Sequence, residues 1–187
     1  SLPDHDIKMT FLPTDFTQVN FELNQKMINL ALELLDLNKE DEVIDLFCGL
    51  GNFTLPISRY VKSVVGIEGD SGLVERAKQN ASQNGISNTS FYKADLFEDV
   101  SGFEWFRGRN YNKALIDPAR TGAIEIVELL PKLNVERLVY VSCNPATLAR
   151  DTARLIDLGF SLESAGVMDM FPQTAHVESI ALFVRKN

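Results

Sequence analysis

Cysteine is scarce in this sequence, whose 187 residues include two, Cys48 and Cys143. Two cysteines without the spacing of a zinc site or a disulfide framework argue against both, so we expect no metal site. No apolar run approaches the ~20 residues that span a bilayer, and no signal-peptide pattern is present. We therefore expect a cytoplasmic protein without membrane contact. The 45% hydrophobic and 24% charged residues are typical of a soluble globular chain.

Positive charge is also in short supply. The sequence has 18 lysines and arginines against 26 aspartates and glutamates, which gives a net charge of −8. This balance has the wrong sign for a surface that binds a phosphate backbone unaided. A nucleic-acid substrate would therefore need a local basic patch or another domain. The phosphate-binding pattern Gly-x-x-x-x-Gly-Lys-Ser/Thr is missing too, which argues against an NTPase.

Strand and helix patterns alternate along most of the chain. Apolar runs bounded by turn residues predict strands at 43–47, 63–68, 89–94, 113–116, 137–142, 161–167 and 179–184. Amphipathic patterns predict helices at 24–37, 71–84 and 147–158. This alternation predicts an α/β fold with a mostly parallel seven-stranded sheet and helices on both faces. The last two strands have no long helical pattern between them, so we expect an antiparallel edge strand.

Two segments lie outside this alternation. Residues 1–23 are predicted to form an N-terminal segment without a core of its own, which leaves residues 24–187 as one domain. Residues 98–112, which include Gly102 and Gly108, are predicted to form a surface loop.

Several strand ends carry residues suited to binding a nucleoside. Gly49 and Gly51 form a turn after the first strand. Glu68 ends the second strand, and Asp95 follows the third. Each alone is also compatible with an ordinary turn or helix cap. Together, at the edge where the carboxyl ends of parallel strands meet, they favour a pocket whose acids bind ribose hydroxyls and an adenine amino group. Without a phosphate-binding loop, S-adenosylmethionine is the ligand that this pocket favours.

Cys143 lies where the strand at 137–142 gives way to Asn144-Pro145. A lone cysteine is more often a small buried residue than a reactive one. At the ligand-binding edge of the sheet, however, a thiol is in the right place to act as a nucleophile. The other strand ends favour this second interpretation.

Five segments of the sequence match a known family. They are 16–20 (FTQVN), 45–56 (DLFCGLGNFTLP), 117–120 (DPAR), 142–151 (SCNPATLARD) and 169–179 (DMFPQTAHVES). In this order and spacing they resemble the catalytic domain of the RNA uracil-5 methyltransferases, which are class I S-adenosylmethionine-dependent enzymes with a Rossmann-like fold. The forms DPAR and SCNPATLARD resemble most the branch that acts on 23S ribosomal RNA, since the tRNA branch typically carries Asp-Pro-Pro-Arg.

The resemblance implies a 23S rRNA (uracil-C5)-methyltransferase. Such an enzyme transfers a methyl group from S-adenosylmethionine to C5 of a uridine through a covalent cysteine–uracil adduct. C5 of uracil is a poor nucleophile, so a thiolate must first add to C6, and a base must later remove the C5 proton. Two alternatives stay open, a tRNA uracil-5 methyltransferase and a non-catalytic S-adenosylmethionine-binding domain. The motifs of cytosine-5 and amino-group methyltransferases are missing, and the glycine pattern of nicotinamide dehydrogenases is incomplete.

The resemblance also assigns roles to individual residues. It implies that Cys143 is the nucleophile, that Glu178 is the base, and that Asp117 lies near both cofactor and uracil. The predicted cofactor-binding residues are Gln18, Phe47, Asn52, Glu68, Asp95 and Asp117. A thiol with an ordinary pKa needs help to ionise, and the sequence offers Arg120 or the helix start near Thr147.

Two further residues are expected to have no catalytic role. The family resemblance also indicates domains that this sequence does not contain. Cys48 is predicted to serve packing, and His176 to line the pocket wall. Members of the 23S branch usually carry an N-terminal RNA-binding β-barrel (TRAM) domain, a central domain and a four-cysteine iron–sulfur cluster. Two cysteines cannot hold such a cluster. We therefore expect a catalytic domain whose ribosomal RNA substrate is bound mainly through N-terminal domains absent here, with no obligate protein partner.

Overall fold

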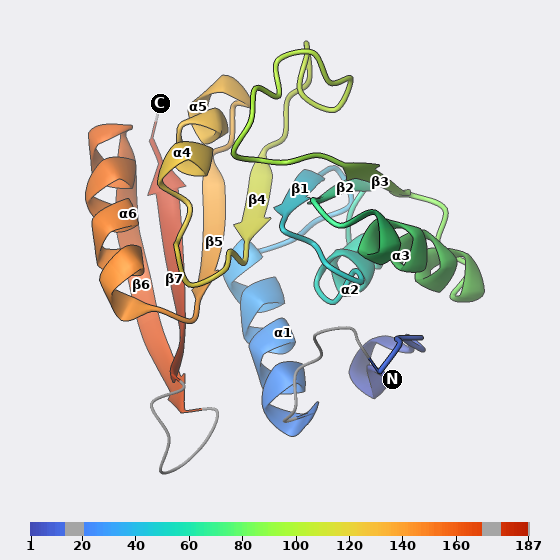
Figure 1. Cartoon of the computed structure of the whole chain (residues 1–187). Coiled ribbons are helices and arrows are strands. Elements are labelled where there is room, and N and C mark those ends of the chain that lie inside the picture. Colours follow the sequence, from blue (N-terminus) through green and yellow to red (C-terminus); the bar gives the residue numbers. More distant parts are fainter. Residues whose placement is uncertain (14–20, 170–176, 187) are drawn as a thin grey trace.

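The structure is a computed structural model that describes residues 1–13, 21–169 and 177–186. Among these residues, seven strands form one sheet in the order β3-β2-β1-β4-β5-β7-β6 (Figure 1). The strands are β1 (Glu42–Leu46), β2 (Ser63–Glu68), β3 (Thr89–Lys93), β4 (Lys113–Ile116), β5 (Arg137–Ser142), β6 (Phe160–Asp169) and β7 (Val177–Arg185). The predicted α/β fold and seven-stranded sheet are confirmed.

The first five strands run parallel, and β7 lies antiparallel between β5 and β6. The strand order reverses direction between β1 and β4, from which the sheet grows outward on both sides. In open α/β sheets, ligands bind in the crevice at this reversal, outside the carboxyl ends of the strands. The fold therefore directs attention to the segments that follow β1 and β4.

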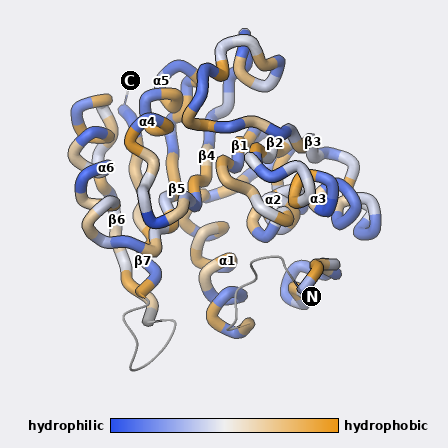
Figure 2. Tube along the Cα trace, viewed as in Figure 1, coloured by the Kyte–Doolittle hydropathy of each residue, from blue (hydrophilic) through white to orange (hydrophobic). Residues whose placement is uncertain are grey.

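Helices cover both faces of the sheet. The helices are α1 (Phe21–Leu35), α2 (Thr54–Ser58), α3 (Ser71–Gln83), α4 (Ile124–Val127), α5 (Leu129–Lys132) and α6 (Pro145–Asp157), with a 3₁₀ turn η1 (Pro3–His5). One apolar cluster joins α1, α2 and α3 to one face, and a second joins α4, α5 and α6 to the other. Figure 2 shows the central strands as largely apolar and α3 as largely polar. Strands buried on both faces are expected to be apolar throughout.

The two clusters take alternate residues of each central strand. In β5, Val139 and Val141 face α1, whereas Leu138 and Tyr140 face the side of α6. This alternation follows from the two-residue period of a strand, in which successive side chains point to opposite faces. Each central strand therefore contributes to both halves of the core.

The segment at 98–112 is a mostly exposed loop, as predicted, but it also contributes to the core. It lacks regular secondary structure, yet Trp105 and Tyr111 are 0% and 1% exposed and belong to the cluster on the α6 side. The hydroxyl of Tyr111 donates a hydrogen bond to the Trp105 carbonyl at 2.7 Å. Its glycines and polar residues obscured the two aromatic side chains that cover this face of the sheet.

The beginning of the chain packs onto the same body. Leu2 and Ile7 are 2% and 1% exposed and join the cluster on the α1 side, where a β-bridge connects them to each other. The first long helix begins at Phe21, three residues before its predicted start. None of the described helices is long and apolar enough to cross a membrane.

Candidate active site at the carboxyl edge of the sheet

The predicted site residues within the described part of the chain gather at one edge of the sheet. They follow or end parallel strands at Phe47, Asn52, Glu68, Asp95, Asp117 and Cys143, and Glu178 lies at the start of the antiparallel β7. Ser142 of β5 pairs with Ser179 of the antiparallel β7, so the adjacent residues Cys143 and Glu178 lie at the same end of this strand pair. The Asp117 amide donates to the Leu46 carbonyl at 3.4 Å, which brings the end of β4 beside the end of β1. Gln18 and His176 lie outside the described residues.

A tight turn connects β1 to α2. Its backbone has positive φ at Phe47 (66°), Gly49 (54°) and Gly51 (90°). A side chain at Phe47 tolerates this left-handed conformation only because the surroundings impose it, and such strain concentrates at functional sites. A Cβ on Gly51 would lie 3.0 Å from Leu55 Cγ, so the turn passes close over the helix. At Gly49, by contrast, a Cβ would meet nothing within 4 Å, so the turn borders open space there, at the edge where a ligand is expected.

Glu68 holds this turn in place. One carboxylate oxygen accepts a hydrogen bond from the Gly49 amide at 3.0 Å, and the other accepts from the Asp70 amide at 3.0 Å. The Cys48 amide donates to the Ile67 carbonyl at 3.0 Å, which joins the turn to the end of β2. The predicted ribose-binding acid is thus in contact with the glycine turn.

An aromatic pair, Phe47 and Phe97, connects the glycine turn to the segment that carries Asp95. Asp95 is exposed, and its carboxylate accepts from the Phe97 amide at 3.0 Å. The rings of Phe97 and Phe47 have centroids 6.1 Å apart at an interplanar angle of 45°. Phe97 is 53% exposed, so the pair presents apolar surface to solvent between the glycine turn and Asp95.

Asn52 connects the turn to α1. Its side-chain amide exchanges two hydrogen bonds of 3.0 Å with the amide of Asn24, which is 6% exposed. The pair satisfies two polar groups that burial would otherwise penalise. Sequence reasoning identified Asn52 but not its partner.

Asp45 is a site residue that sequence reasoning missed. It lies on β1 directly before the turn, is 0% exposed, and accepts a hydrogen bond of 2.5 Å from the Thr54 hydroxyl. Its second carboxylate oxygen has no hydrogen-bond partner among the described residues. Burial, together with the nearby Glu68, raises the pKa of Asp45 to about 7. The available signal was a lone acid inside an apolar strand.

The two cysteines differ in their surroundings. Cys48 is 5% exposed, and a Cβ on Gly66 would lie 2.9 Å from its sulfur, which agrees with the predicted packing role. Burial, followed by Asp45 and Glu68, raises the pKa of the Cys48 thiol. Cys143 is partly exposed and forms no disulfide. It is therefore the thiol that a ligand at this edge can reach.

Carboxyl groups dominate the electrostatics around Cys143. Burial raises the pKa of its thiol, Glu178 and Asp117 raise it further, and Arg120 lowers it. Of the two activating groups predicted, Arg120 thus acts in the expected direction but does not outweigh the rest. The resting thiol keeps its proton at neutral pH.

Asp117 and Glu178 are both protonated more readily than ordinary carboxyl groups. Burial, then Glu178 and Asp45, raises the pKa of Asp117 well above its usual value. Burial alone raises the pKa of Glu178 to about 7. A carboxyl group with a pKa near the working pH suits proton transfer in either direction. Across the described ranges, no three histidine, cysteine, aspartate or glutamate residues are grouped to hold a metal ion.

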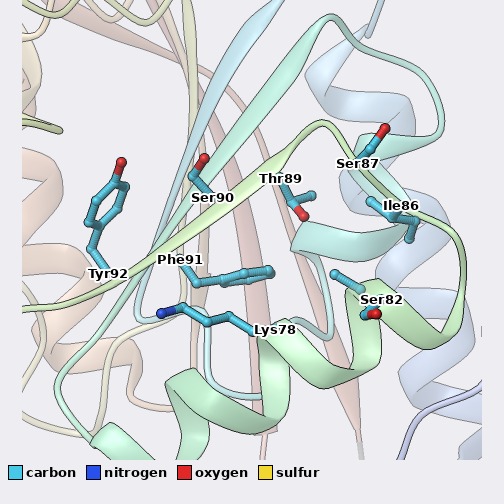
Figure 3. Close-up of a pocket in the computed structure, with 9 residues that line it drawn as sticks. Lys78, Ser82, Ile86, Ser87, Thr89, Ser90, Phe91 and Tyr92 are labelled. Atoms are coloured by element: carbon cyan, nitrogen blue, oxygen red, sulfur yellow. The ribbon is translucent and has the colours of Figure 1, made fainter.

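A separate hollow of about 490 Å³ lies between α3 and β3 (Figure 3). Lys78, Ser82, Phe91 and Tyr92 are among the residues that line it. None of the predicted site residues belongs to this lining. The hollow is therefore distinct from the edge that carries the chemical groups.

The profile of the family described as tRNA (Uracil-5-)-methyltransferase matches residues 1–186. The chain belongs to this family. Family membership confirms the resemblance that the motifs indicated.

Curated relatives within this family carry a ribosomal RNA name. A protein of Vesicomyosocius okutanii subsp. Calyptogena okutanii, named 23S rRNA (uracil(1939)-C(5))-methyltransferase RlmD, is 74% identical over 183 residues, which are 98% of this chain and 42% of that protein. A protein of the same name from Xanthomonas oryzae pv. oryzae is 57% identical over 186 residues, which are 99% and 42% of the two chains. The chain thus spans less than half the length of these relatives.

A solved structure of the same family shares the fold. The tRNA (uracil-54, C5)-methyltransferase of Pyrococcus abyssi, in complex with S-adenosyl-L-homocysteine, superposes with a TM-score of 0.80 at 26% identity. The match covers 96% of this chain and 42% of that one. The predicted class I methyltransferase fold is therefore confirmed.

Proposed function

We propose that this chain is the catalytic domain of a 23S rRNA (uracil-C5)-methyltransferase that acts through a covalent cysteine–uracil adduct. The observation that carries the proposal is the convergence of Cys143, Asp117 and Glu178 beside the glycine turn, at the edge of the sheet where ligands bind. The names of the relatives at 74% and 57% identity support ribosomal RNA as the substrate.

The proposed reaction uses Cys143 as the nucleophile and Glu178 as the base. The Cys143 thiol first loses its proton to solvent, and the resulting thiolate adds to C6 of the uracil. The electron pair of the C5–C6 double bond moves into the ring as an enolate, which makes C5 nucleophilic. After C5 has gained a methyl group, the Glu178 carboxylate removes the C5 proton and the C6–sulfur bond breaks. The double bond is restored and the thiolate leaves. We propose that Asp117 contacts both the ring and the cofactor.

S-adenosylmethionine supplies the methyl group in this scheme when it is bound. The groups available to hold it fit a cation that carries an adenosine. The glycine turn borders open space at Gly49, and the buried Asp45 has a carboxylate oxygen without a partner among the described residues. The residues proposed to hold it are Gln18, Phe47, Asn52, Glu68, Asp95 and Asp117. Carboxyl groups without a cationic partner in the described part of the chain favour a cationic ligand at this edge.

The proposal extends to the setting in which the chain works. Residues 24–187 make up the methyltransferase domain, preceded by the N-terminal segment 1–23. Ribosomal RNA is held mainly by parts of the longer protein outside this chain, because 26 acidic residues against 18 basic ones disfavour binding of a phosphate backbone. The enzyme acts in the cytoplasm, without a membrane and without an obligate protein partner.

Mechanism-based trapping tests the proposal. The protein in its longest natural form is incubated with S-adenosylmethionine and a 23S rRNA fragment in which 5-fluorouridine replaces uridine. Fluorine at C5 cannot be removed as a proton, so we expect a stable methylated adduct on the peptide that contains Cys143, detected by mass spectrometry. Cys143→Ala should abolish the adduct, whereas Cys48→Ala, the matched control, should still form it.

Two outcomes would contradict the proposal. Binding of both ligands without modification of Cys143 would exclude the adduct mechanism and favour a non-catalytic S-adenosylmethionine-binding domain. An adduct that forms with fluorinated tRNA but not with the ribosomal fragment would keep the mechanism and move the substrate to tRNA. Running the two RNAs side by side therefore separates reaction class from substrate class.

A further inference from the structure

The loop that follows β4, residues 117–122, is fastened to the start of α6. The Arg120 carbonyl accepts hydrogen bonds from the side-chain amide of Asn144 at 2.9 Å and from the hydroxyl of Thr147 at 3.2 Å. Asn144 directly follows Cys143 and also caps α6, since its oxygen accepts from the Ala146 amide at 3.0 Å. The turn that carries the nucleophile therefore binds the loop that carries Asp117.

A second set of bonds lies one turn further along α6. Asp151 is 0% exposed, and one of its carboxylate oxygens accepts from the Ala123 amide at 2.7 Å and from the Tyr140 hydroxyl at 2.6 Å. The other oxygen accepts from the Arg150 guanidinium at 2.9 Å. Arg150 also donates to the Thr121 carbonyl at 2.9 Å. Asp151 thus connects three elements: the end of the loop, strand β5 and helix α6.

The 117–122 loop packs so closely against α6 that no side chain fits between them at Gly122. Gly122 has a φ of +77°, and a Cβ there would lie 2.7 Å from an Arg150 nitrogen, 2.8 Å from an Asp151 oxygen and 2.9 Å from Thr147 Cβ. Asn144, Thr147 and Asp151 are three and four residues apart, so they share one face of α6. The loop therefore lies flat against this face.

We propose that Asp151, together with Tyr140, is a positioning residue that fixes the loop bearing Asp117 and Arg120 against the turn bearing Cys143. The inference rests on the proposed function of Cys143. Asp117 and Cys143 follow two different strands, and the sheet register alone does not set how close the 117–122 loop lies to the turn at Cys143. The network around Asp151 sets it, from a buried place that does not touch substrate. Burial and the Asp151 carboxylate raise the pKa of Tyr140, which keeps its hydroxyl a donor.

Two conservative substitutions test this role in the full-length protein. Tyr140→Phe removes one hydrogen bond to Asp151 and leaves the ring in the core, and Asp151→Asn removes the negative charge. Since a misplacement of about 1 Å can cost about 100-fold in rate, we expect roughly 10-fold slower trapping of 5-fluorouridine RNA for Tyr140→Phe and roughly 100-fold slower trapping for Asp151→Asn. Dissociation constants for S-adenosylhomocysteine should stay within about twofold, because the loss falls on the chemical step.

A second measurement follows the loop directly. Hydrogen exchange of the Ala123 amide, whose N–H binds Asp151, should quicken in both variants while exchange in β1 stays unchanged. The pH at which trapping is half-maximal should also stay where it is in the wild type, because Cys143, Asp117 and Glu178 are untouched. A lower maximal trapping rate with an unchanged pH midpoint indicates altered positioning.

Arg154→Gln is the matched control. Arg154 lies on the same helix and pairs with Glu128, away from the 117–122 loop, so its loss loosens α6 without releasing the loop. Trapping at the wild-type rate in Tyr140→Phe and Asp151→Asn would overturn the proposal, as would equal slowing by Arg154→Gln. A wild type that forms no Cys143 adduct would overturn the proposed function and this proposal with it. Slow trapping in the two variants alone supports the positioning role.

Discussion

Buried or half-buried carboxyl groups lie at both ends of the sheet, but their surroundings are opposite. At the amino end, Asp41 is 2% exposed and accepts from the Lys113 ammonium at 2.7 Å. Burial raises the pKa of Asp41, but Lys113 and neighbouring amide donors outweigh it, so that the pKa lies below its usual value. At the carboxyl end, the pKa values of Asp45, Asp117 and Glu178 are all raised.

The difference separates a structural use of a carboxyl group from a functional one. Asp41 is fully paired, so its charge is neutralised within the chain and stabilises the fold. Asp45 keeps an oxygen without a partner among the described residues. Burial and then Glu178 raise the pKa values of both Asp117 and Cys143. Carboxyl groups with raised pKa values that cluster at one edge, at a cost in stability, are typical of a functional site that binds a ligand.

Glu178→Gln should have the largest effect in this comparison. Removing a general base costs typically about 10²–10⁴-fold in rate, and we expect turnover to fall within that range. With unmodified RNA, the methylated adduct on Cys143 should accumulate, because the C5 proton can no longer be removed. Intact-mass analysis of the protein–RNA complex measures this. Turnover within threefold of the wild type would show that another group is the base.

The sheet was predictable and the site only in part. All seven strands agree with prediction to within two residues at each end. Strands that are buried on both faces appear in the sequence as continuous apolar runs, which are easy to recognise. α4 and α5 were missed, since helices of four residues are too short for a periodic pattern. Asp45 was missed because its partner Thr54 lies nine residues later in the sequence, and only the folded turn brings the two side chains together. The partner of Asn52 is likewise on α1, 28 residues earlier.

Lys113→Met should have the next largest effect, at the amino end of the sheet. Methionine keeps the length of the side chain but leaves the buried Asp41 without its cation, and loss of one partner of a buried pair costs about 3–5 kcal/mol. Chemical denaturation should show this decrease in the free energy of unfolding, while the trapping rate of the folded fraction stays unchanged.

Lys62→Met is the matched control for Lys113→Met. The Lys62 ammonium lies 3.2 Å from Glu42, but the two side chains are 60% and 40% exposed. Exposed pairs contribute about 0–1 kcal/mol, so this variant should unfold almost like the wild type. Equal losses in both variants would mean that burial of the Asp41 pair is unimportant.

The most gradual effect, spread over the range between pH 4 and 7, is a change in the pH dependence of stability on replacing Asp45. Its pKa is raised from 3.8 to about 7 in the folded chain, so between these values the folded state holds a proton that the unfolded state has released. The stability that this group contributes is therefore full below pH 4 and is lost as the pH rises through 7. Asp45→Asn should reduce the decline over this window by at most about 1.4 kcal/mol per pH unit.

Asp41→Asn gives the opposite sign in the same experiment. The folded pKa of Asp41 is lowered, so its stabilisation is present above its unfolded pKa and is lost as the pH falls through the folded value. Removing it should flatten the acid side of the stability curve and leave the slope between pH 4 and 7 intact. Free energies of unfolding measured from pH 3 to pH 8 would reveal both changes. If the two variants altered the same part of the curve, the contrast between the ends of the sheet would not be electrostatic in origin.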